Sequence, residues 1–215
     1  MVPLGDLGRD GTQLRYFMFA REPVARCISH YQYRRNKDER SDFEPWLARH
    51  SEYVTRFLCR GRADRELARV VPDADRAIEA IDRHVGFVGL QERFDESLVM
   101  LARWVGDPDF DPAYRARNVA RSGSLRGGIL SDPRLVELIR EHHREDEKVY
   151  RHIRDVVYPR QVAAYGPTLA ADLEALRARL PAPQSRVVAR GLAAIRRGLF
   201  YKPLARALRP GEARS

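Results

Sequence analysis

Residues 14–31 read Leu-Arg-Tyr-Phe-Met-Phe-Ala-Arg-Glu-Pro-Val-Ala-Arg-Cys-Ile-Ser-His-Tyr. The apolar first part predicts a buried strand over residues 15–20. Pro23 suits the first position of a helix, and the apolar residues after it recur at helical spacing, which predicts a helix over 23–37. The segment is therefore expected to form a strand, a sharp turn and a helix.

The turn between this strand and this helix carries Arg21. Open α/β sheets bind phosphorylated ligands at such turns, because helix N–H groups and the positive end of the helix dipole lie there. The Arg21 guanidinium is a planar charged fork that suits phosphate oxygens, and Ser29 can add a hydroxyl to the same anion. The alternative interpretation is an ordinary strand–helix unit with a surface arginine.

A second strand is predicted at Val85-Gly-Phe-Val-Gly-Leu90, an uninterrupted apolar run typical of a strand buried on both faces of a parallel sheet. A turn over residues 91–96 leads from it into a helix at 97–105. The order strand, helices, strand, helices predicts an α/β fold with a parallel sheet flanked by helices. Two strands are few for such a sheet, so we expect a helix-rich domain.

Several further helices follow from capping and periodicity. The spacing predicts them at residues 41–57, 73–84, 132–157 and 168–180. The helix over 41–57 opens with a capping box, and its buried stripe is expected to comprise Phe43, Trp46, Leu47, His50, Tyr53, Val54 and Phe57. The helix over 132–157 is expected to bury His142 among apolar residues. Residues 114–128 are polar and rich in Arg and Gly, which predicts a loop.

The net charge of +9 is concentrated near the C-terminus. Residues 182–215 contain eight basic residues and the single acid Glu212, a net charge of +7. Three parts are therefore expected: a loose segment at 1–13, an α/β domain at 14–180 and a basic amphipathic tail at 181–215. Within the tail, residues 185–209 suit contact with an anionic membrane surface or a partner groove, or form a solubilising terminus. No specific nucleic-acid binding is expected.

The composition restricts the class of protein. No run approaches the ~20 apolar residues that span a bilayer, and no secretory signal is visible at the first residues. Cys27 and Cys59 give neither a disulfide framework nor a metal cluster, and Cys27 is expected to be a small core residue. A reducing cytoplasm fits this pattern, with peripheral membrane contact through the tail as an additional expectation.

Two motifs resemble the sulfotransferases that use 3′-phosphoadenosine-5′-phosphosulfate. One is the strand followed by Arg-(Asp/Glu)-Pro-Val-x-Arg and Ser-x-Tyr, matched here by Arg21, Pro23, Arg26, Ser29 and Tyr31. The other is the strand end Val-Gly-Leu-x-Glu-Arg-Phe-Asp-Glu, matched within residues 85–98. The chain is most similar in style to the carbohydrate-type branch, which includes heparan sulfate 2-O-sulfotransferases and bacterial proteins. The resemblance implies a P-loop-like α/β fold.

The resemblance also implies a donor site. Arg21 and Ser29 would hold the 3′-phosphate of the donor, and Arg93 would stand near it at the sheet edge. The loop from Tyr114 to Arg126 is similar to one that closes over the nucleotide, and its contacts would be Arg121, Ser122 and Arg126. The donor is the co-substrate, and no metal is expected. For Glu92, pairing with Arg26 or Arg93 to fix the turn is the preferred interpretation.

The family's loop for the 5′-phosphosulfate, roughly Pro-Lys-x-Gly-Thr-(Thr/Ser), has no counterpart in these residues. Gly8-Arg-Asp-Gly-Thr12 precedes a strand, contains no lysine and is interpreted as a turn. We therefore expect an N-terminally incomplete form of the domain.

No residue is clearly marked as the catalytic base. Histidine is the natural choice near neutral pH, and His30 is the only histidine beside a donor-site residue. His50 and His142 fall on apolar stripes and are expected in the core. Residues 142–147 contain metal-ligand types at adjacent positions around a helix, which favours a solvated surface.

Two functions from different classes remain open at this stage. The first is a sulfotransferase that moves a sulfuryl group from the donor nucleotide to a hydroxyl of a carbohydrate or small molecule. The second is a non-catalytic nucleotide-binding remnant, or a membrane- or partner-interacting protein that acts through its basic tail. The acceptor, the base and the oligomeric state do not follow from the sequence.

Overall fold

The computed structural model describes residues 15–35, 42–60, 66–114 and 124–180. The predicted segment 1–13, the predicted tail 181–215, Arg121 and Ser122 lie outside these residues. One compact unit, within residues 1–112 and 118–178, holds nearly all the described elements. Of the described residues, Ala113, Tyr114, Arg179 and Leu180 are assigned to a second unit.

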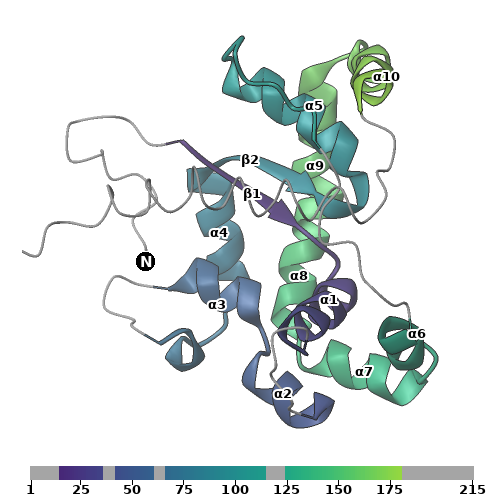
Figure 1. Ribbon diagram of the computed structural model, residues 1–215. Coiled ribbons are helices and arrows are strands. Elements are labelled where there is room, and N and C mark those ends of the chain that lie inside the picture. The colour runs from purple at the N-terminus through teal and green to yellow at the C-terminus, as the bar shows by residue number, and fades with distance from the viewer. Residues whose placement is uncertain (1–14, 36–41, 61–65, 115–123, 181–215) are drawn as a thin grey trace, which may run out of the picture. The chain divides into compact units, whose positions relative to one another are not determined.

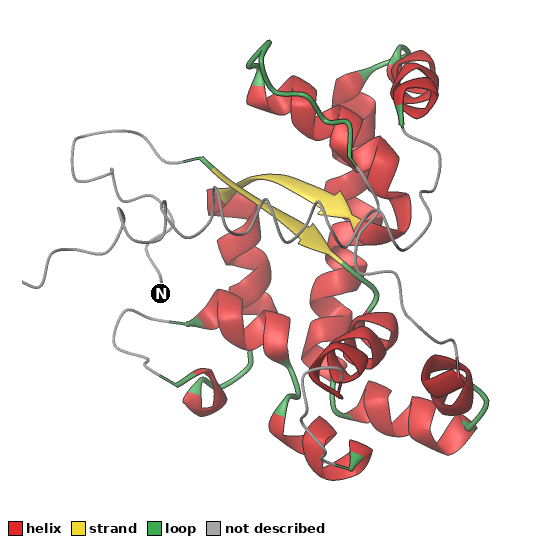
Figure 2. Cartoon of the chain, viewed as in Figure 1, coloured by secondary structure: helices red, strands yellow, loops and turns green. Residues whose placement is uncertain are grey.

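The described chain is rich in helix and contains two strands (Figure 2). The strands and the first helices are β1 (Tyr16–Ala20), α1 (Pro23–Arg35), α2 (Phe43–Arg49), α3 (Tyr53–Cys59), α4 (Ala74–His84) and β2 (Val85–Leu90). The later helices are α5 (Phe94–Val105), α6 (Ser124–Leu130), α7 (Pro133–Glu141), α8 (Arg144–His152), α9 (Tyr158–Tyr165) and α10 (Leu169–Arg179). Shorter helical turns are η1 (Leu67–Arg69), η2 (Gln91–Arg93) and the π-helical η3 (Ile153–Val157).

The two strands pair in parallel, with Phe17 opposite Phe87 and Met18 opposite Val88 (Figure 1). The expected strands and their parallel pairing are therefore confirmed, and the described part of the chain is α/β. The expected burial of the first strand is wrong at Phe17, whose side chain is 53% exposed. Parallel strands need a long crossover, which here consists of α1 to α4. Both strands end at the same edge of the sheet, so the turns after Ala20 and Leu90 are neighbours.

The glycines of β2 make room for aromatic rings. A Cβ at Gly89 would lie 2.5 Å from the Phe19 ring, and one at Gly86 would lie 2.6 Å from the Trp104 ring. The two rings therefore lie directly over the strand backbone. The pattern Val-Gly-Phe-Val-Gly-Leu thus combines strand-forming apolar residues with two positions that must lack a side chain.

A core cluster joins α1 to α2, α6 and α7. Its buried members are Val24, Cys27, Ile28, Tyr31, Trp46, Leu47, Ile129 and Ile139. The expected burial of Cys27 is confirmed, since its side chain is buried and its thiol is free. This packing holds the first turns of α1 in place below the sheet edge.

The single helix expected at 41–57 is wrong, because the structure has two helices with a break at His50–Glu52. Glu52 adopts a left-handed conformation with φ of 52°. Its carboxylate accepts hydrogen bonds from the backbone N–H groups of Glu145 and Asp146 at 3.0 and 2.8 Å. Because of this break, the residues after it no longer continue the apolar face predicted for a single helix. Tyr53 and Phe57, which were expected on that face, are exposed.

Two other predicted elements differ from the structure. Residues 124–130 form α6 rather than a loop, because Leu125 and Ile129 pack against the α1 cluster. The helix predicted at 132–157 is interrupted at His142 and His143, then continues to Tyr165. This interruption buries His143 and leaves His142 only partly buried, the reverse of the expected pattern.

The helices predicted at 73–84 and 168–180 match α4 and α10 to within a residue or two. Asp73 caps α4, since its side chain accepts a hydrogen bond from the Arg76 N–H. Among the residues that the structure describes, no helix combines the length and apolar character needed to cross a bilayer.

Candidate nucleotide site at the sheet edge

Arg21 lies in the turn between β1 and α1, one residue after the end of the strand. Ser29 lies two helical turns into α1, on the face opposite the buried residues Val24, Cys27 and Ile28. No hydrogen bond or ion pair joins the side chain of Arg21 or Ser29 to another described residue. A guanidinium and a hydroxyl are thus available at the position expected from the sequence.

The N-terminus of α1 is already occupied by a side chain. The Glu22 carboxylate accepts hydrogen bonds from the backbone N–H groups of Val24 and Ala25 at 3.0 and 2.6 Å. These are the N–H groups that a bound anion would otherwise use. An anion at this turn therefore has to be held by side chains, which makes Arg21 and Ser29 the relevant groups.

Glu92 connects the two turns at the sheet edge. Its carboxylate accepts a hydrogen bond from the backbone N–H of Glu22 at 2.9 Å. Burial, followed by the nearby Glu92 charge, raises the pKa of the Tyr150 hydroxyl on α8 to about 12. The expected pairing of Glu92 with Arg26 or Arg93 is wrong, but its expected role in fixing the turn agrees with these contacts.

Arg93 lies in η2, directly after β2, and its side chain is exposed. It donates to the Glu96 carboxylate at 2.8 Å, and its guanidinium carbon lies 5.5 Å from the centre of the Tyr158 ring. It also borders a pocket of about 440 Å³ formed by Gln91, Glu92, Arg93, Phe94, Asp95, Glu96, Leu173 and Arg177. Arg177 donates to Asp95 at 3.4 Å across this pocket wall. Arg21 and Ser29 do not line it.

Arg126 lies on α6, and its side chain is exposed. The core cluster brings α6 against α1, so Arg126 and Ser29 belong to neighbouring helices. Its predicted companions, Arg121 and Ser122, lie outside the described residues.

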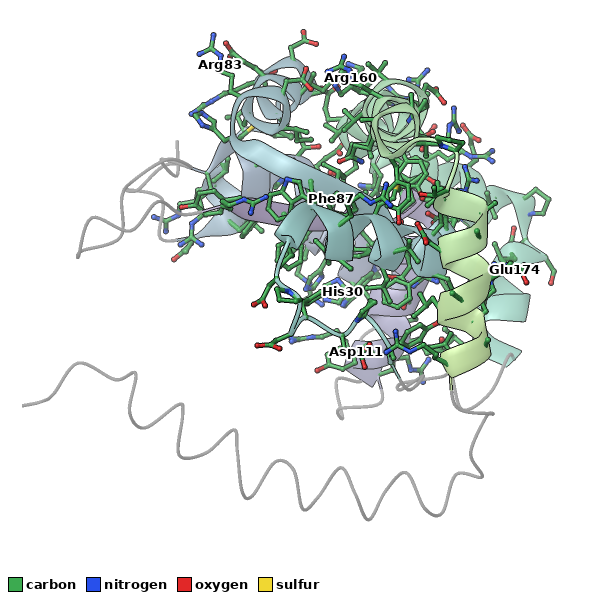
Figure 3. The ribbon with its side chains drawn as sticks, turned by 90° about the horizontal axis from the view of Figure 1, so that it is seen from above. His30, Arg83, Phe87, Asp111, Arg160 and Glu174 are labelled. Carbon is green, nitrogen blue, oxygen red and sulfur yellow. The ribbon has the colours of Figure 1, made fainter. Side chains whose placement is uncertain are left out.

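His30, labelled in Figure 3, lies among aromatic rings. Its ring centre is 5.2 Å from that of Trp46, 5.5 Å from that of His50 and 5.9 Å from that of Tyr53. His50 stacks on Trp46 and its Nδ1 lies 2.8 Å from the Trp46 carbonyl oxygen. These contacts give both histidines a packing role between α1 and α2.

A buried charge network beside α1 was not predicted from the sequence pattern. Arg26 donates to the Asp146 carboxylate at 2.9 Å, with the Asp146 side chain only 1% exposed. Asp146 also accepts from the Thr55 N–H and the Thr55 hydroxyl, both at 2.7 Å. Since Glu52 caps α8 and Asp146 receives the first N–H groups of α3, the two helices cap each other. In the local sequence, the only indication of this mutual capping was an acidic residue near the start of α3 and of α8.

His143 lies next to this network and is buried. Its Nδ1 lies 2.9 Å from the Ile139 carbonyl oxygen. Burial, followed by the nearby Arg26 charge, lowers the pKa of His143 to about 4, so the ring is neutral at neutral pH. Burial likewise raises the pKa of the Cys27 thiol to about 12, which leaves it unreactive.

Within the described ranges, no group of three or more His, Cys, Asp or Glu side chains is placed to hold a metal ion. Comparison of the chain with models of protein families, with curated proteins and with solved structures gives no match.

Proposed function

We propose that this chain is a sulfotransferase that uses 3′-phosphoadenosine-5′-phosphosulfate. In this proposal Arg21 and Ser29 hold the 3′-phosphate of the donor, and the acceptor is a hydroxyl of a carbohydrate or small molecule. The domain would then be a P-loop-like α/β domain with its nucleotide at the carboxyl edge of the sheet.

One observation carries the proposal. The parallel pairing of β1 and β2 brings Arg21 and the segment Gln91–Arg93 to the same edge of the sheet, although 70 residues separate Glu22 from Glu92. The two sequence motifs that resemble the family are therefore adjacent in space, and Arg21 has no ion-pair partner among the described residues.

The side chains at this edge supply the chemistry that such a nucleotide needs. Arg21 can donate two parallel hydrogen bonds to one phosphate, and the Ser29 hydroxyl can donate a third. Arg93 adds positive charge, because its ion pair with Glu96 is solvent-exposed on the arginine side and can be exchanged for a ligand. Arg121, Ser122 and Arg126 are proposed as further contacts to the nucleotide. No base is assigned.

Calorimetric titration with 3′,5′-adenosine bisphosphate, the product of sulfuryl transfer, tests the nucleotide site. We expect saturable binding by the wild type and strongly weakened binding by Arg21→Ala. Absence of binding by the wild type would overturn the proposal. Replacement of Arg83, an exposed arginine on α4, is the matched control and should leave binding unchanged.

Nucleotide binding without transfer is the second candidate function. The 215 residues contain no Pro-Lys-x-Gly-(Thr/Ser) loop for the 5′-phosphosulfate, whereas Arg21 and Ser29 are present at the proposed site of the 3′-phosphate. Incubation with donor carrying labelled sulfate and a panel of hydroxyl acceptors distinguishes the two. Label in an acceptor supports the transferase, and binding of the bisphosphate with no labelled acceptor supports the binding protein.

A further inference from the structure

Arg93, directly after β2, is held in two ways by one residue, Tyr158 of α9. Its guanidinium carbon lies 5.5 Å from the centre of the Tyr158 ring. Its Nη2 group donates to Oε2 of Glu96 at 2.8 Å. The other oxygen of that carboxylate, Oε1, accepts a hydrogen bond from the Tyr158 hydroxyl at 2.9 Å. The ring of Tyr158 therefore contacts the arginine, and its hydroxyl fixes the carboxylate that pairs with the arginine.

The Tyr158 hydroxyl is in turn connected to the strand. It lies 3.2 Å from the Ser97 hydroxyl, which accepts from the Leu90 N–H at 2.9 Å and lies 3.2 Å from the Leu90 carbonyl oxygen. Tyr158 and Ser97 are both buried, and burial raises the pKa of Tyr158 well above its ordinary value. Its hydroxyl therefore stays protonated and can donate to Glu96. A chain of hydrogen bonds thus runs from the last residue of β2 to Arg93.

The place of Tyr158 on its helix depends on the π-helical turn η3 that precedes it. Tyr150, which lies near Glu92, is eight residues earlier, and in a regular α-helix the two tyrosines would be about 80° apart around the axis. A π-helical turn accommodates one extra residue, so both tyrosines fall on nearly the same face. Gln161, three residues after Tyr158, accepts from the Val88 N–H at the edge of β2. The π-helical turn, a rare geometry often found at functional sites, therefore brings this helix face to the end of β2.

We propose that Tyr158 is a positioning residue for Arg93, and that its ring and its hydroxyl, the latter acting through Glu96, hold the guanidinium at the sheet edge where the nucleotide binds. A long arginine side chain loses rotamer freedom when it binds a ligand, and ordering it beforehand removes that cost from binding. The Arg93 side chain is 55% exposed, so the ordered guanidinium remains accessible to a ligand. The effect on nucleotide binding rests on the proposed function, whereas the ordering of Arg93 does not.

Chemical modification of arginine measures this ordering without any ligand. Phenylglyoxal reacts with guanidinium groups, and peptide mapping by mass spectrometry gives the rate at each arginine separately. Tyr158→Phe keeps the ring and removes the hydroxyl, so Arg93 should react about 2- to 10-fold faster than in the wild type. Arg26, buried with Asp146, should stay unmodified if the variant is folded. If it reacts, Glu96→Gln makes the same test. An unchanged rate at Arg93 in a folded variant overturns the proposal.

Tyr165 provides a matched control on the same helix. Its hydroxyl donates to Asp172 at 2.7 Å, and Asp172 pairs with Arg103 at 3.2 Å. The Arg103 guanidinium carbon lies 3.5 Å from the centre of the Tyr165 ring. The same combination of tyrosine, carboxylate and arginine thus recurs near the C-terminal end of α5, whereas Arg93 lies at its N-terminal end. Tyr165→Phe should speed the modification of Arg103 and leave that of Arg93 unchanged.

Calorimetry with 3′,5′-adenosine bisphosphate tests what this ordering does for the nucleotide. We expect Tyr158→Phe to weaken binding about 2- to 10-fold when Arg93 is present and to have no further effect in the Arg93→Ala background. No weakening, or equal weakening in both backgrounds, would show that Tyr158 does not act through Arg93 and would overturn the proposal. Absence of binding by the wild type would overturn the proposed function instead, and the modification rates would still decide whether Tyr158 orders Arg93.

Discussion

The guanidinium of Arg26 donates to the Asp146 carboxylate at 2.9 Å, joining α1 to α8 across 120 residues of sequence. Asp146 is almost completely buried and also receives the first N–H groups of α3. Arg26 belongs to the same helix as Ser29 and lies near its start. The ion pair therefore fixes the helix that positions the candidate nucleotide site.

Replacement of Asp146 by Asn should lower the free energy of unfolding by about 3–5 kcal/mol, because it leaves the Arg26 charge without its buried counter-charge. Urea unfolding of the purified variant measures this change. Glu44→Gln is the control, since the Glu44–Arg134 ion pair is exposed and should contribute little. If both substitutions lowered the free energy of unfolding equally, burial would not make the Arg26–Asp146 ion pair more stabilising than an exposed ion pair.

His143 predicts a specific pH dependence. Its pKa is about 4 in the folded protein and about 6.5 in an unfolded chain, so the unfolded state binds the proton more readily. The contribution of this group is constant above pH 6.5, and stability is lost as the pH falls from about 6.5 to about 4. Burial raises the pKa of Glu52, which acts in the opposite direction.

Comparison of His143→Gln with the wild type isolates this contribution from that of Glu52. The unfolding free energy of the variant should vary less between pH 6.5 and 4. His142→Gln, one residue away and only partly buried, should keep the wild-type slope. Parallel pH profiles for the wild type and His143→Gln would contradict the assignment.

Gly89→Ala should destabilise the protein by about 1–3 kcal/mol, because the new methyl group would lie 2.5 Å from the Phe19 ring. Adding Phe19→Leu to this variant should recover part of the loss. Gly127→Ala, on α6 with open space around it, should be neutral or stabilising. Thermal unfolding of the four proteins tests this, and a tolerated Gly89→Ala would contradict the close approach of Phe19.

Gln161→Leu should cost about 1–3 kcal/mol for each backbone group of Val88 that it leaves unpaired and buried. Hydrogen exchange at the Val88 amide should become faster, which reports on this edge in particular. Arg160→Leu, at an exposed position of the same helix (Figure 3), is the control and should leave the exchange rate unchanged. An unchanged exchange rate at the Val88 amide in Gln161→Leu would mean that the Gln161 side chain does not protect this edge of β2.

Local patterns were sufficient for the two strands and for the helices α4 and α10. The run Val85–Leu90 coincides with β2, and Asp73 caps α4 as an Asp before a periodic segment should. The break at Glu52 was not predictable in this way, because its left-handed conformation serves hydrogen bonds to Glu145 and Asp146 far along the chain. α6 was missed for a similar reason, since its packing on α1 outweighs two glycines.

In the candidate site, too, some features followed from the sequence and others depend on contacts made only in the folded protein. The position of Arg21 at the end of β1 and of Arg93 at the end of β2 followed from motif order and parallel pairing. The occupation of the α1 N-terminus by Glu22 and the bond from Glu22 to Glu92 depend on side-chain geometry in the folded turn. Sequence spacing suggested Arg26 or Arg93 as the partner of Glu92, whereas the folded turn gives it the Glu22 N–H.

In the proposed site Arg21 binds the 3′-phosphate of the donor, and binding measurements with two ligands and two proteins determine its contribution. Calorimetry would compare 3′,5′-adenosine bisphosphate with adenosine 5′-phosphate, on the wild type and on Arg21→Ala. A charged hydrogen-bond pair contributes about 1.5–3 kcal/mol, so Arg21→Ala should weaken the bisphosphate by about 10- to 100-fold and leave the 5′-phosphate unchanged. Equal weakening of the binding of both ligands, or no preference of the wild type for the bisphosphate, would show that Arg21 does not bind the 3′-phosphate.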